Sequence, residues 1–291
     1  MKANKTISTE LLDNSDAFTD EFYKRFHLRN APSPLKLSAD ITKDYLFPTF
    51  YGNVTCALGI FLCDYDKAQK LLPNEDMTPV RMPGNKALVT FSCYEYKNVL
   101  GVAPYNEIAM TIPIQIRPRL NPPILPILME KQFSRFGYHV FHMPVTSLEN
   151  QIRGIKIWGL PKVVDDIEIK IKDGTSETTA TDADGNDYFK LKIPTSGNST
   201  HFDVNSNLYS ILDGEIKQSE TCFKADFNVN KNMSRLWKSA VNQEEVALEL
   251  GSGPYAEMLK YLDIDPIPFQ TRYAADMNAC FDLPNPNYQL P

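Results

Sequence analysis

The chain has 291 residues, of which 43% are hydrophobic and 23% are charged, so its composition is that of an ordinary globular protein with a sizeable core. The formal net charge is −6 and the densest basic stretch, 117–119, is too short to follow a phosphate backbone, which argues against a nucleic-acid-binding surface. No stretch approaches the roughly 18 apolar residues that cross a bilayer, and residues 1–20 lack the apolar segment of a secretory signal. We therefore expect a cytoplasmic protein with no membrane partner.

Residues 1–44 are polar and mixed in pattern, and we interpret them as an N-terminal extension before a single domain at 45–291. Within the extension, Phe18, Phe22 and Phe26 recur every four residues, which predicts a helix over about 16–26. Such an apolar stripe is more often a face that packs on the domain than a ligand site.

Short strands are predicted along the first half of the domain. An apolar run at 51–63 indicates a buried strand, Asp64 can cap a helix over 65–72, and 86–96 is a second strand rich in β-formers. The clearest alternation is at 107–116, where four isoleucines and a methionine share one face while Glu107 shares the other with uncharged residues.

The segment 119–129 is rich in proline and apolar residues, and neither a helix nor a central strand suits it. We interpret it as an insertion that covers the domain, contacts another subunit or closes over a pocket.

Beyond residue 162 the alternation returns at 167–171, and β-prone stretches at 178–181 and 188–193 flank a turn at 182–187. This turn has the aspartates of a calcium loop but no closing glutamate, so a hairpin is expected. A helix is predicted over 254–262. The chain is thus predicted to be α+β and mainly antiparallel β.

Cysteines and histidines give no sign of a disulfide or a metal. Five cysteines are present, an odd number without CxxC spacing, so reduced core thiols are expected. His139 and His142 differ in parity, which predicts opposite sides of one strand. The sequence also lacks a Gly-rich phosphate loop and a Gly-x-Ser-x-Gly elbow, so we expect no metal and no cofactor.

Two charged residues are candidates for chemistry. Lys162 follows Pro161 and precedes two valines; burial disfavours the charged form of a lysine, and a neutral lysine can attack a ketone to form a Schiff base. The alternative is a strand-edge lysine whose stem covers apolar surface while its head stays in water. Glu107, at the head of the alternating strand, is either a surface group or a pocket-lining acid.

Two segments together resemble the acetoacetate decarboxylase superfamily. They are Pro104-Tyr105-Asn106-Glu107 before an apolar strand and, about fifty residues later, Trp158-Gly159-Leu160-Pro161-Lys162; a weaker match lies at 251–268. The resemblance covers roughly residues 45–284. It implies a closed, cone-like β-barrel with flanking sheet and a few helices, and a homo-oligomer. It places the Schiff-base lysine at Lys162 and an active-site glutamate at Glu107.

The chain also departs from the family's pattern. The family's second lysine corresponds to Val163, a second glutamate corresponds to Ser92, and an arginine expected near Val54 is missing. We therefore expect a pocket with less charge than the family's. Lys156 would not replace the lost cation, because six residues of extended strand span about 20 Å. The residues predicted to line the pocket are Phe91, Ser92, Tyr94, Tyr105, Trp158 and Val163.

These residues predict a carbon–carbon lyase that holds a keto acid or a related small carbonyl compound as an imine of Lys162, with decarboxylation as the default reaction. Glu107 would shuttle a proton or orient the substrate, and no cofactor would be needed. Two alternatives stay open: an aldolase or dehydratase that uses the same lysine, and a barrel that binds a small apolar ligand without catalysis.

Overall fold

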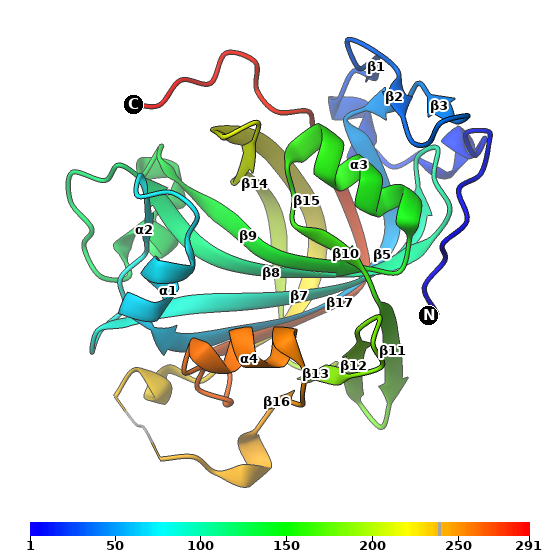
Figure 1. Cartoon of the computed structure of the whole chain (residues 1–291). Coiled ribbons are helices and arrows are strands. Elements are labelled where there is room, and N and C mark those ends of the chain that lie inside the picture. The colour runs from blue at the N-terminus through cyan, green and yellow to red at the C-terminus, as the bar shows by residue number, and fades with distance from the viewer. Residues whose placement is uncertain (238–239) are drawn as a thin grey trace.

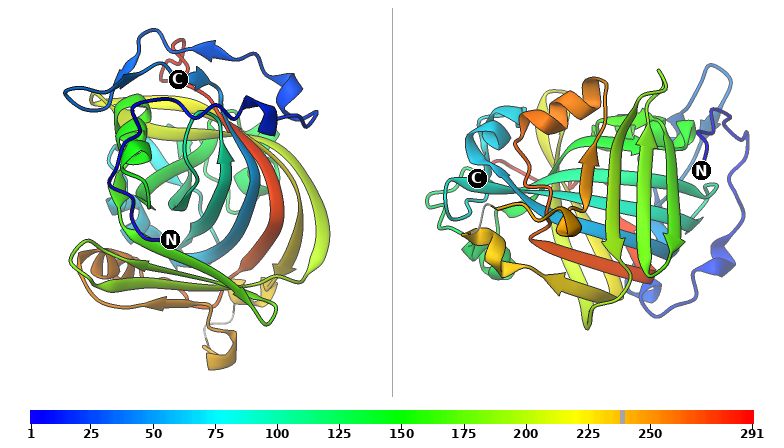
Figure 2. Two further views of the ribbon diagram at one scale, coloured as in Figure 1. Left: turned by 90° about the vertical axis from the view of Figure 1, so that its right-hand side faces the viewer. Right: turned by 90° about the horizontal axis from the view of Figure 1, so that it is seen from below.

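The computed structural model describes residues 1–237 and 240–291, and in these residues seven long strands close into a barrel (Figure 1). Neighbouring strands are antiparallel except β9 and β14, and the pairing of β8 with β9 closes the ring. The view along the barrel shows this ring (Figure 2, left). In ring order the strands are β9 (Phe136–Val145), β14 (Asn198–Leu212), β15 (Glu215–Lys231), β17 (Gln270–Phe281), β5 (Thr49–Asp64), β7 (Lys86–Val99) and β8 (Tyr105–Ile116).

Smaller elements surround the barrel. Two short strands extend its sheet, β10 (Lys162–Val164) beside β9 and β6 (Met77–Pro79) beside β8. A second, antiparallel sheet contains β11 (Asp166–Lys172), β12 (Thr175–Thr181), β13 (Asp187–Pro194) and β16 (Leu248–Leu250). The extension contributes the pair β2 (Leu35–Lys36) with β3 (Thr42–Lys43), and its strand β1 (Arg29–Asn30) pairs with β4 (Leu46–Phe47) at the start of the domain.

The helices are short and lie outside the ring. In Figure 1, α3 lies above the barrel and α4 below it. The α-helices are α1 (Tyr65–Leu71), α2 (Leu125–Leu128), α3 (Leu148–Trp158) and α4 (Pro254–Tyr261). The 3₁₀ turns are η1 (Ser15–Ala17), η2 (Tyr23–Arg25), η3 (Glu130–Gln132), η4 (Met233–Leu236) and η5 (Gln243–Glu245). This architecture confirms the predicted α+β class with a closed barrel and mainly antiparallel strands.

The core lies between the barrel and the structures packed on its outside. The isoleucine face of β8 packs against the second sheet and α4, where Ile108 and Ile112 join Leu191 and Leu259 in one cluster. All twelve residues of β8 are buried, because its other face looks into the barrel. The alternation seen in the sequence therefore separates an outer core face from an inner cavity face.

Several predicted elements are confirmed. Helix α1 begins where Asp64 accepts a hydrogen bond from the Lys67 amide at 2.9 Å, and α4 agrees with the predicted helix at 254–262 to within one residue. The turn after Thr181 joins β12 and β13 as a hairpin. All five cysteines are free and buried, as expected.

The helix predicted over 16–26 is wrong. Only two three-residue 3₁₀ turns form there, because the Asp20 carboxylate accepts a hydrogen bond from the Phe22 amide at 2.7 Å and so competes with a helical path. The aromatic stripe still packs on the domain, since Phe18 and Phe22 are buried in a cluster with Phe50.

The proline-rich segment contains a helix where none was expected. Helix α2 has Pro126 in its first turn, where the missing N–H removes no intrahelical hydrogen bond. Ile127 and Leu128 line the space inside the barrel. The segment therefore covers one side of that space, which was one of its three predicted roles.

His139 and His142 were predicted to lie on opposite sides of one strand, and this prediction is wrong. The pairing of β8 with β9 shifts by one residue between Met110 and Thr111, which changes the alternation of side chains along β9. Val140 and Met143 both face the cavity, so His139 and His142 both point outward. Nδ1 of His139 lies 3.0 Å from the Tyr209 carbonyl oxygen, and the His142 ring stacks on Tyr255 at 4.2 Å. Neither belongs to a cluster of metal-binding side chains among the described residues.

The buried histidines should make the protein sensitive to acid. Burial lowers the pKa of His142 and of His139 to about 4, so the unfolded chain takes up protons at a higher pH than the native one. Stability should therefore be complete above about pH 6.5 and fall towards pH 4, by about 3 kcal/mol per histidine. Urea unfolding of the wild type and of His142→Phe across this range should give a flatter pH profile for the variant. Identical profiles would show that His142 does not contribute.

Candidate active site

The segment that carries Lys162 is a helix followed by a sharp turn. Helix α3 begins at Ser147, whose Oγ accepts from the Asn150 amide at 3.3 Å, and ends at Gly159, whose φ of 65° is accessible chiefly to glycine. The extended strand expected between Lys156 and Lys162 is therefore wrong. Lys156 is exposed and donates to the Lys36 carbonyl at 2.6 Å. It therefore does lie apart from Lys162, but because of the helix and the turn at Gly159 and not because of an extended strand.

Lys162 and Glu107 form a buried ion pair. Nζ of Lys162 donates to Oε2 of Glu107 at 2.6 Å, and only 6% and 4% of the two side chains are exposed. Tyr96 donates to the other carboxylate oxygen at 3.2 Å, and the Tyr105 ring centroid lies 5.8 Å from Nζ. This geometry contradicts both the solvated strand-edge lysine and the surface glutamate.

The pair opens into a cavity of about 1040 Å³ inside the barrel. Ser92, Tyr94 and Trp158 line it, as predicted, together with Lys162 and Glu107. This volume is at the upper end of the roughly 300–1,000 Å³ that is typical for pockets of drug-sized ligands.

None of the helices in the described part of the chain is long and apolar enough to span a membrane.

Three residues that were predicted to line the pocket do not line it. Phe91 precedes Ser92 on β7 and so points to the outer face, where it packs against Phe61 and Phe189. Val163 follows Lys162 on β10 and faces a separate cavity of about 440 Å³. Tyr105 does not line the large cavity; it is fully buried among aromatic rings and contacts Tyr96 at 4.9 Å.

Two arginines that the sequence analysis did not place in the pocket also line the cavity. Arg153, on α3, donates to Asn150 at 2.9 Å and to Thr49 at 3.0 Å, and its guanidinium lies 4.3 Å from the Tyr45 ring centroid. Arg272 comes from the last strand, β17. The sequence signal for Arg153 was its position directly before Gly154, next to the segment that resembled the family.

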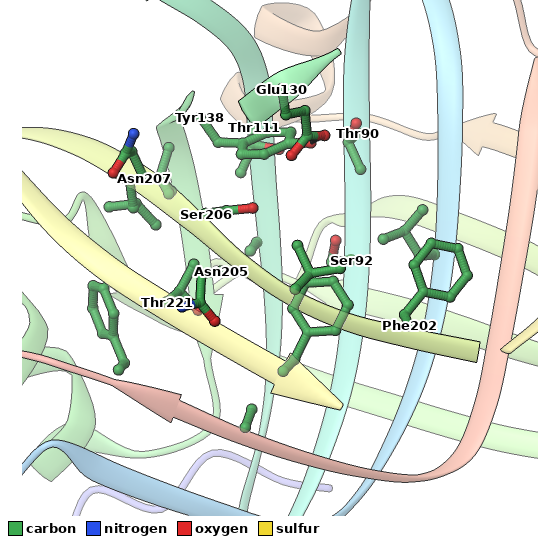
Figure 3. Close-up of a pocket in the computed structure, with 18 of the residues that line it drawn as sticks. Thr90, Ser92, Thr111, Glu130, Tyr138, Phe202, Asn205, Ser206, Asn207 and Thr221 are labelled. Atoms are coloured by element: carbon green, nitrogen blue, oxygen red, sulfur yellow. Dashed lines mark hydrogen bonds between the residues drawn. The ribbon is translucent and has the colours of Figure 1, made fainter. Parts of the chain in front are cut away.

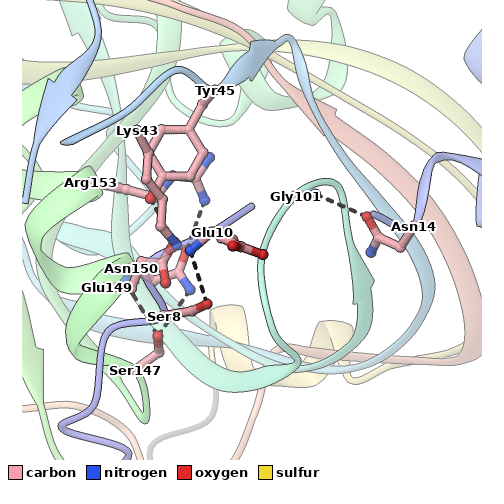
Figure 4. A network of polar contacts seen from close by, with 10 residues as sticks. All are labelled: Ser8, Glu10, Asn14, Lys43, Tyr45, Gly101, Ser147, Glu149, Asn150 and Arg153. Carbon is pink, nitrogen blue, oxygen red and sulfur yellow. Dashed lines mark hydrogen bonds and ion pairs between the residues drawn. The ribbon is translucent and has the colours of Figure 1, made fainter. Parts of the chain in front are cut away.

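The N-terminal extension holds α3 in place from outside (Figure 4). Lys43 donates to Glu149 at 2.8 Å and Tyr45 donates to the same carboxylate at 2.6 Å, with all three side chains buried. Glu149 lies one helical turn before Arg153. The extension therefore fixes the helix that supplies Arg153 and Gly154 to the site.

The tyrosines around the pair remain neutral. Burial raises the pKa of Tyr51 to about 12 and raises the pKa of Tyr96 well above its ordinary value. Both hydroxyls therefore keep their protons at neutral pH, and Tyr96 serves as a hydrogen-bond donor to Glu107.

Gly154 makes room for the lysine stem. A Cβ atom at this position would lie 2.4 Å from Cδ of Lys162. Gly154→Ala should therefore displace Lys162 and lower turnover at least about tenfold, and overpacking should cost about 1–3 kcal/mol even though alanine favours a helix by about 1 kcal/mol. Kinetics and denaturant unfolding, with exposed Ile155→Ala as the control, test this. Wild-type rate and stability in Gly154→Ala would show that the contact is unimportant.

Comparisons with known proteins agree with this fold. A profile of the family described as acetoacetate decarboxylase (ADC) matches residues 32–268. The matched residues make up most of the chain, which therefore belongs to the acetoacetate decarboxylase family, a family of lyases. Comparison with curated protein sequences gives no match.

Three solved structures have a similar fold. Acetoacetate decarboxylase from Legionella pneumophila is 14% identical with a TM-score of 0.54, over 98% of this chain and 97% of that one. A second acetoacetate decarboxylase structure is 15% identical with a TM-score of 0.52, over 81% and 87%. The enduracididine biosynthesis enzyme MppR, in complex with pyruvate, is 11% identical with a TM-score of 0.52, over 81% and 88%.

Proposed function

We propose that the protein is a carbon–carbon lyase that binds a carbonyl substrate as an imine of Lys162, with decarboxylation of a keto acid as its reaction. The observation that carries this proposal is the buried pair of Lys162 and Glu107 at the wall of a large cavity. A primary amine and a proton acceptor 2.6 Å apart are the two groups that imine formation requires.

The proton route follows from the pair's geometry. In the proposed first step, Glu107 takes one proton from Lys162, and the neutral amine attacks the carbonyl carbon of the substrate. The carbinolamine then loses its hydroxyl as water, with the proton supplied by Glu107. The product is an iminium that carries the positive charge on the former Nζ.

The iminium acts as an electron sink for decarboxylation. When a β-keto acid loses CO2, the electron pair of the broken C–C bond moves towards the iminium nitrogen and leaves an enamine. Protonation of the enamine carbon and hydrolysis of the resulting imine release the ketone and restore Lys162. Glu107 is a carboxylate again once water has left, so a proton from solvent must reprotonate it before it, hydrogen-bonded to Tyr96, can protonate the enamine carbon.

The cavity supports a substrate larger than acetoacetate. At about 1040 Å³ it has the size of sites for drug-sized ligands, and a four-carbon keto acid would leave most of it filled with water. We therefore expect kcat/KM for CO2 release to rise with side-chain size along a series of β-keto acids, by at least about tenfold from acetoacetate to the best member. Maximal activity on acetoacetate would contradict this choice of substrate.

The second candidate is aldol or dehydration chemistry at the same lysine. The cavity volume favours it, because a second carbonyl compound fits beside the imine. The related fold of MppR is known with pyruvate bound, so pyruvate with an aldehyde belongs in the assay panel. Carbon–carbon bond formation without CO2 release would make this candidate the function. Binding of an apolar ligand without a trappable imine would instead leave a non-catalytic barrel.

The cytoplasmic location and the homo-oligomeric state stay predictions.

A further inference from the structure

Arg272 lines the cavity on the side opposite Lys162. The ring order places β17 three strands from β9 in one direction and four in the other, so the two strands face each other across the barrel. Lys162, on β10, pairs with Met143 on β9. Both Lys162 and Arg272 line the same cavity. On β17, Arg272 is in register with Leu58, which pairs with Ser92, and all three side chains face inward.

The guanidinium of Arg272 has no polar partner among the described residues. It takes part in none of their hydrogen bonds or ion pairs, and its Nε is buried and unsatisfied. Its guanidinium carbon lies 4.7 Å from the Phe202 ring centroid, and burial lowers the pKa of Arg272. Leaving a cation unpaired in a partly apolar environment is costly, so an anion that enters the cavity would be stabilised there.

One carboxyl group, that of Glu130, faces the same region and attracts Arg272 without a direct contact. Glu130 forms no ion pair with the arginine; instead Tyr138 donates to it at 3.3 Å. Burial raises the pKa of Glu130, while the hydrogen bond from Tyr138 and the charge of Arg272 act against this rise. Figure 3 shows Glu130 and Tyr138 near Thr111, and Asn205, Ser206 and Asn207 on β14, the strand that pairs with β9 at Tyr138.

We propose that Arg272 is the centre of a second subsite, which binds a carboxylate at the far end of the substrate while Lys162 holds the carbonyl group as an imine. A single planar guanidinium next to a carboxyl group suits a monoanionic carboxylate, which it can bind through two parallel hydrogen bonds, better than a dianionic phosphate. This inference rests on the proposed function of Lys162. It narrows the substrate to a carbonyl compound with an apolar chain and a distal carboxylate.

Matched ketones test the subsite. Borohydride trapping on Lys162 should be measured over a range of concentrations for 4-oxopentanoate, 6-oxoheptanoate and 8-oxononanoate, and for 2-alkanones of the same carbon number. At the best chain length, the oxo acid should be trapped at about 10- to 100-fold lower concentration than its neutral match, as expected for one charge-assisted contact. Equal trapping at every length would overturn the subsite.

Variants of Arg272 test whether this residue causes the preference for the oxo acid. Arg272→Gln should remove the preference, measured as the ratio of the trapping concentrations of 6-oxoheptanoate and 2-heptanone in the same variant, whereas Arg272→Lys should keep part of it. The exposed Arg119→Gln is the matched control and should behave as wild type. A preference that survives in folded Arg272→Gln, checked by circular dichroism, would refute the role of Arg272.

A second readout separates this inference from the proposed function. Heptanoate has the carboxylate but no carbonyl group, so its binding cannot depend on an imine. Heptanoate should raise the melting temperature of the wild type and of Lys162→Arg, but not that of Arg272→Gln. If no ketone is trapped, the proposed function of Lys162 fails, yet stabilisation by heptanoate that requires Arg272 would still support the subsite. If heptanoate raises the melting temperature of Arg272→Gln as well, or of neither protein, the subsite is refuted.

Discussion

Lys162→Arg is expected to abolish both imine trapping and turnover. An arginine at this position keeps a positive charge beside Glu107, 2.6 Å from the present Nζ, but a guanidinium remains protonated and is not a nucleophile at neutral pH. The loss of activity would therefore report the missing amine and not a collapsed site. Borohydride labelling with a keto acid, followed by intact-mass measurement, and a CO2-release assay give the two readouts.

Two further variants make this test secure. Lys162→Ala alone would leave Glu107 buried and unpaired, which costs about 3–5 kcal/mol, so Lys162→Met should be combined with Glu107→Gln to remove both charges. The exposed Lys156→Ala, six residues earlier, is the control and should retain labelling and rate. Full turnover in folded Lys162→Arg would exclude the imine mechanism.

Glu107→Gln is expected to slow turnover by about 10²- to 10⁴-fold while an imine on Lys162 can still be trapped. Glutamine keeps the size of the side chain and can accept hydrogen bonds from Lys162 and Tyr96, but it cannot take or return a proton. The rate of labelling and the rate of product release should be measured separately.

The matched control for Glu107 is Glu95→Gln, on the neighbouring strand β7, where the carboxylate is partly exposed. It should behave as wild type. Unchanged turnover in Glu107→Gln would show that the carboxylate only neutralises the lysine, and loss of trapping together with turnover would assign it to imine formation alone.

Local patterns in the sequence predicted three of the seven barrel strands, β5, β7 and β8, and marked Lys162 and Glu107 individually as candidate residues. The alternation at 107–116 correctly assigned an inner and an outer face to β8, because its side chains alternate with period two and both faces are buried. The pairing of Lys162 with Glu107 depended on family resemblance, since 55 residues separate them and no local pattern specifies such a contact.

The errors have identifiable physical causes. Helix α3 was missed because the run from Lys156 to Lys162 was taken as extended strand, although Ser147 and Gly159 are good caps for a helix. Phe91 and Val163 were assigned to the pocket because they adjoin residues that do line it, but side chains next to each other on a strand point to opposite faces.

The two cavity arginines depend on tertiary structure. Arg153 reaches the site because α3 lies across the barrel and the extension holds it through Lys43 and Glu149. Arg272 reaches it because the last strand pairs with β5, more than two hundred residues earlier in the chain. A sequence comparison restricted to the family's expected positions finds neither.

Peptide mapping after borohydride reduction tests most directly whether Lys162 forms an imine with a carbonyl substrate. Trypsin cleaves after unmodified Lys156, Lys162 and Lys170, so reduction of an imine at Lys162 should block one cut. The predicted product is a peptide spanning 157–170 that carries one reduced substrate mass, and it should be absent when borohydride or the keto compound is omitted. Labelling confined to other lysines, with normal cleavage after Lys162 during active turnover, would contradict an imine at Lys162.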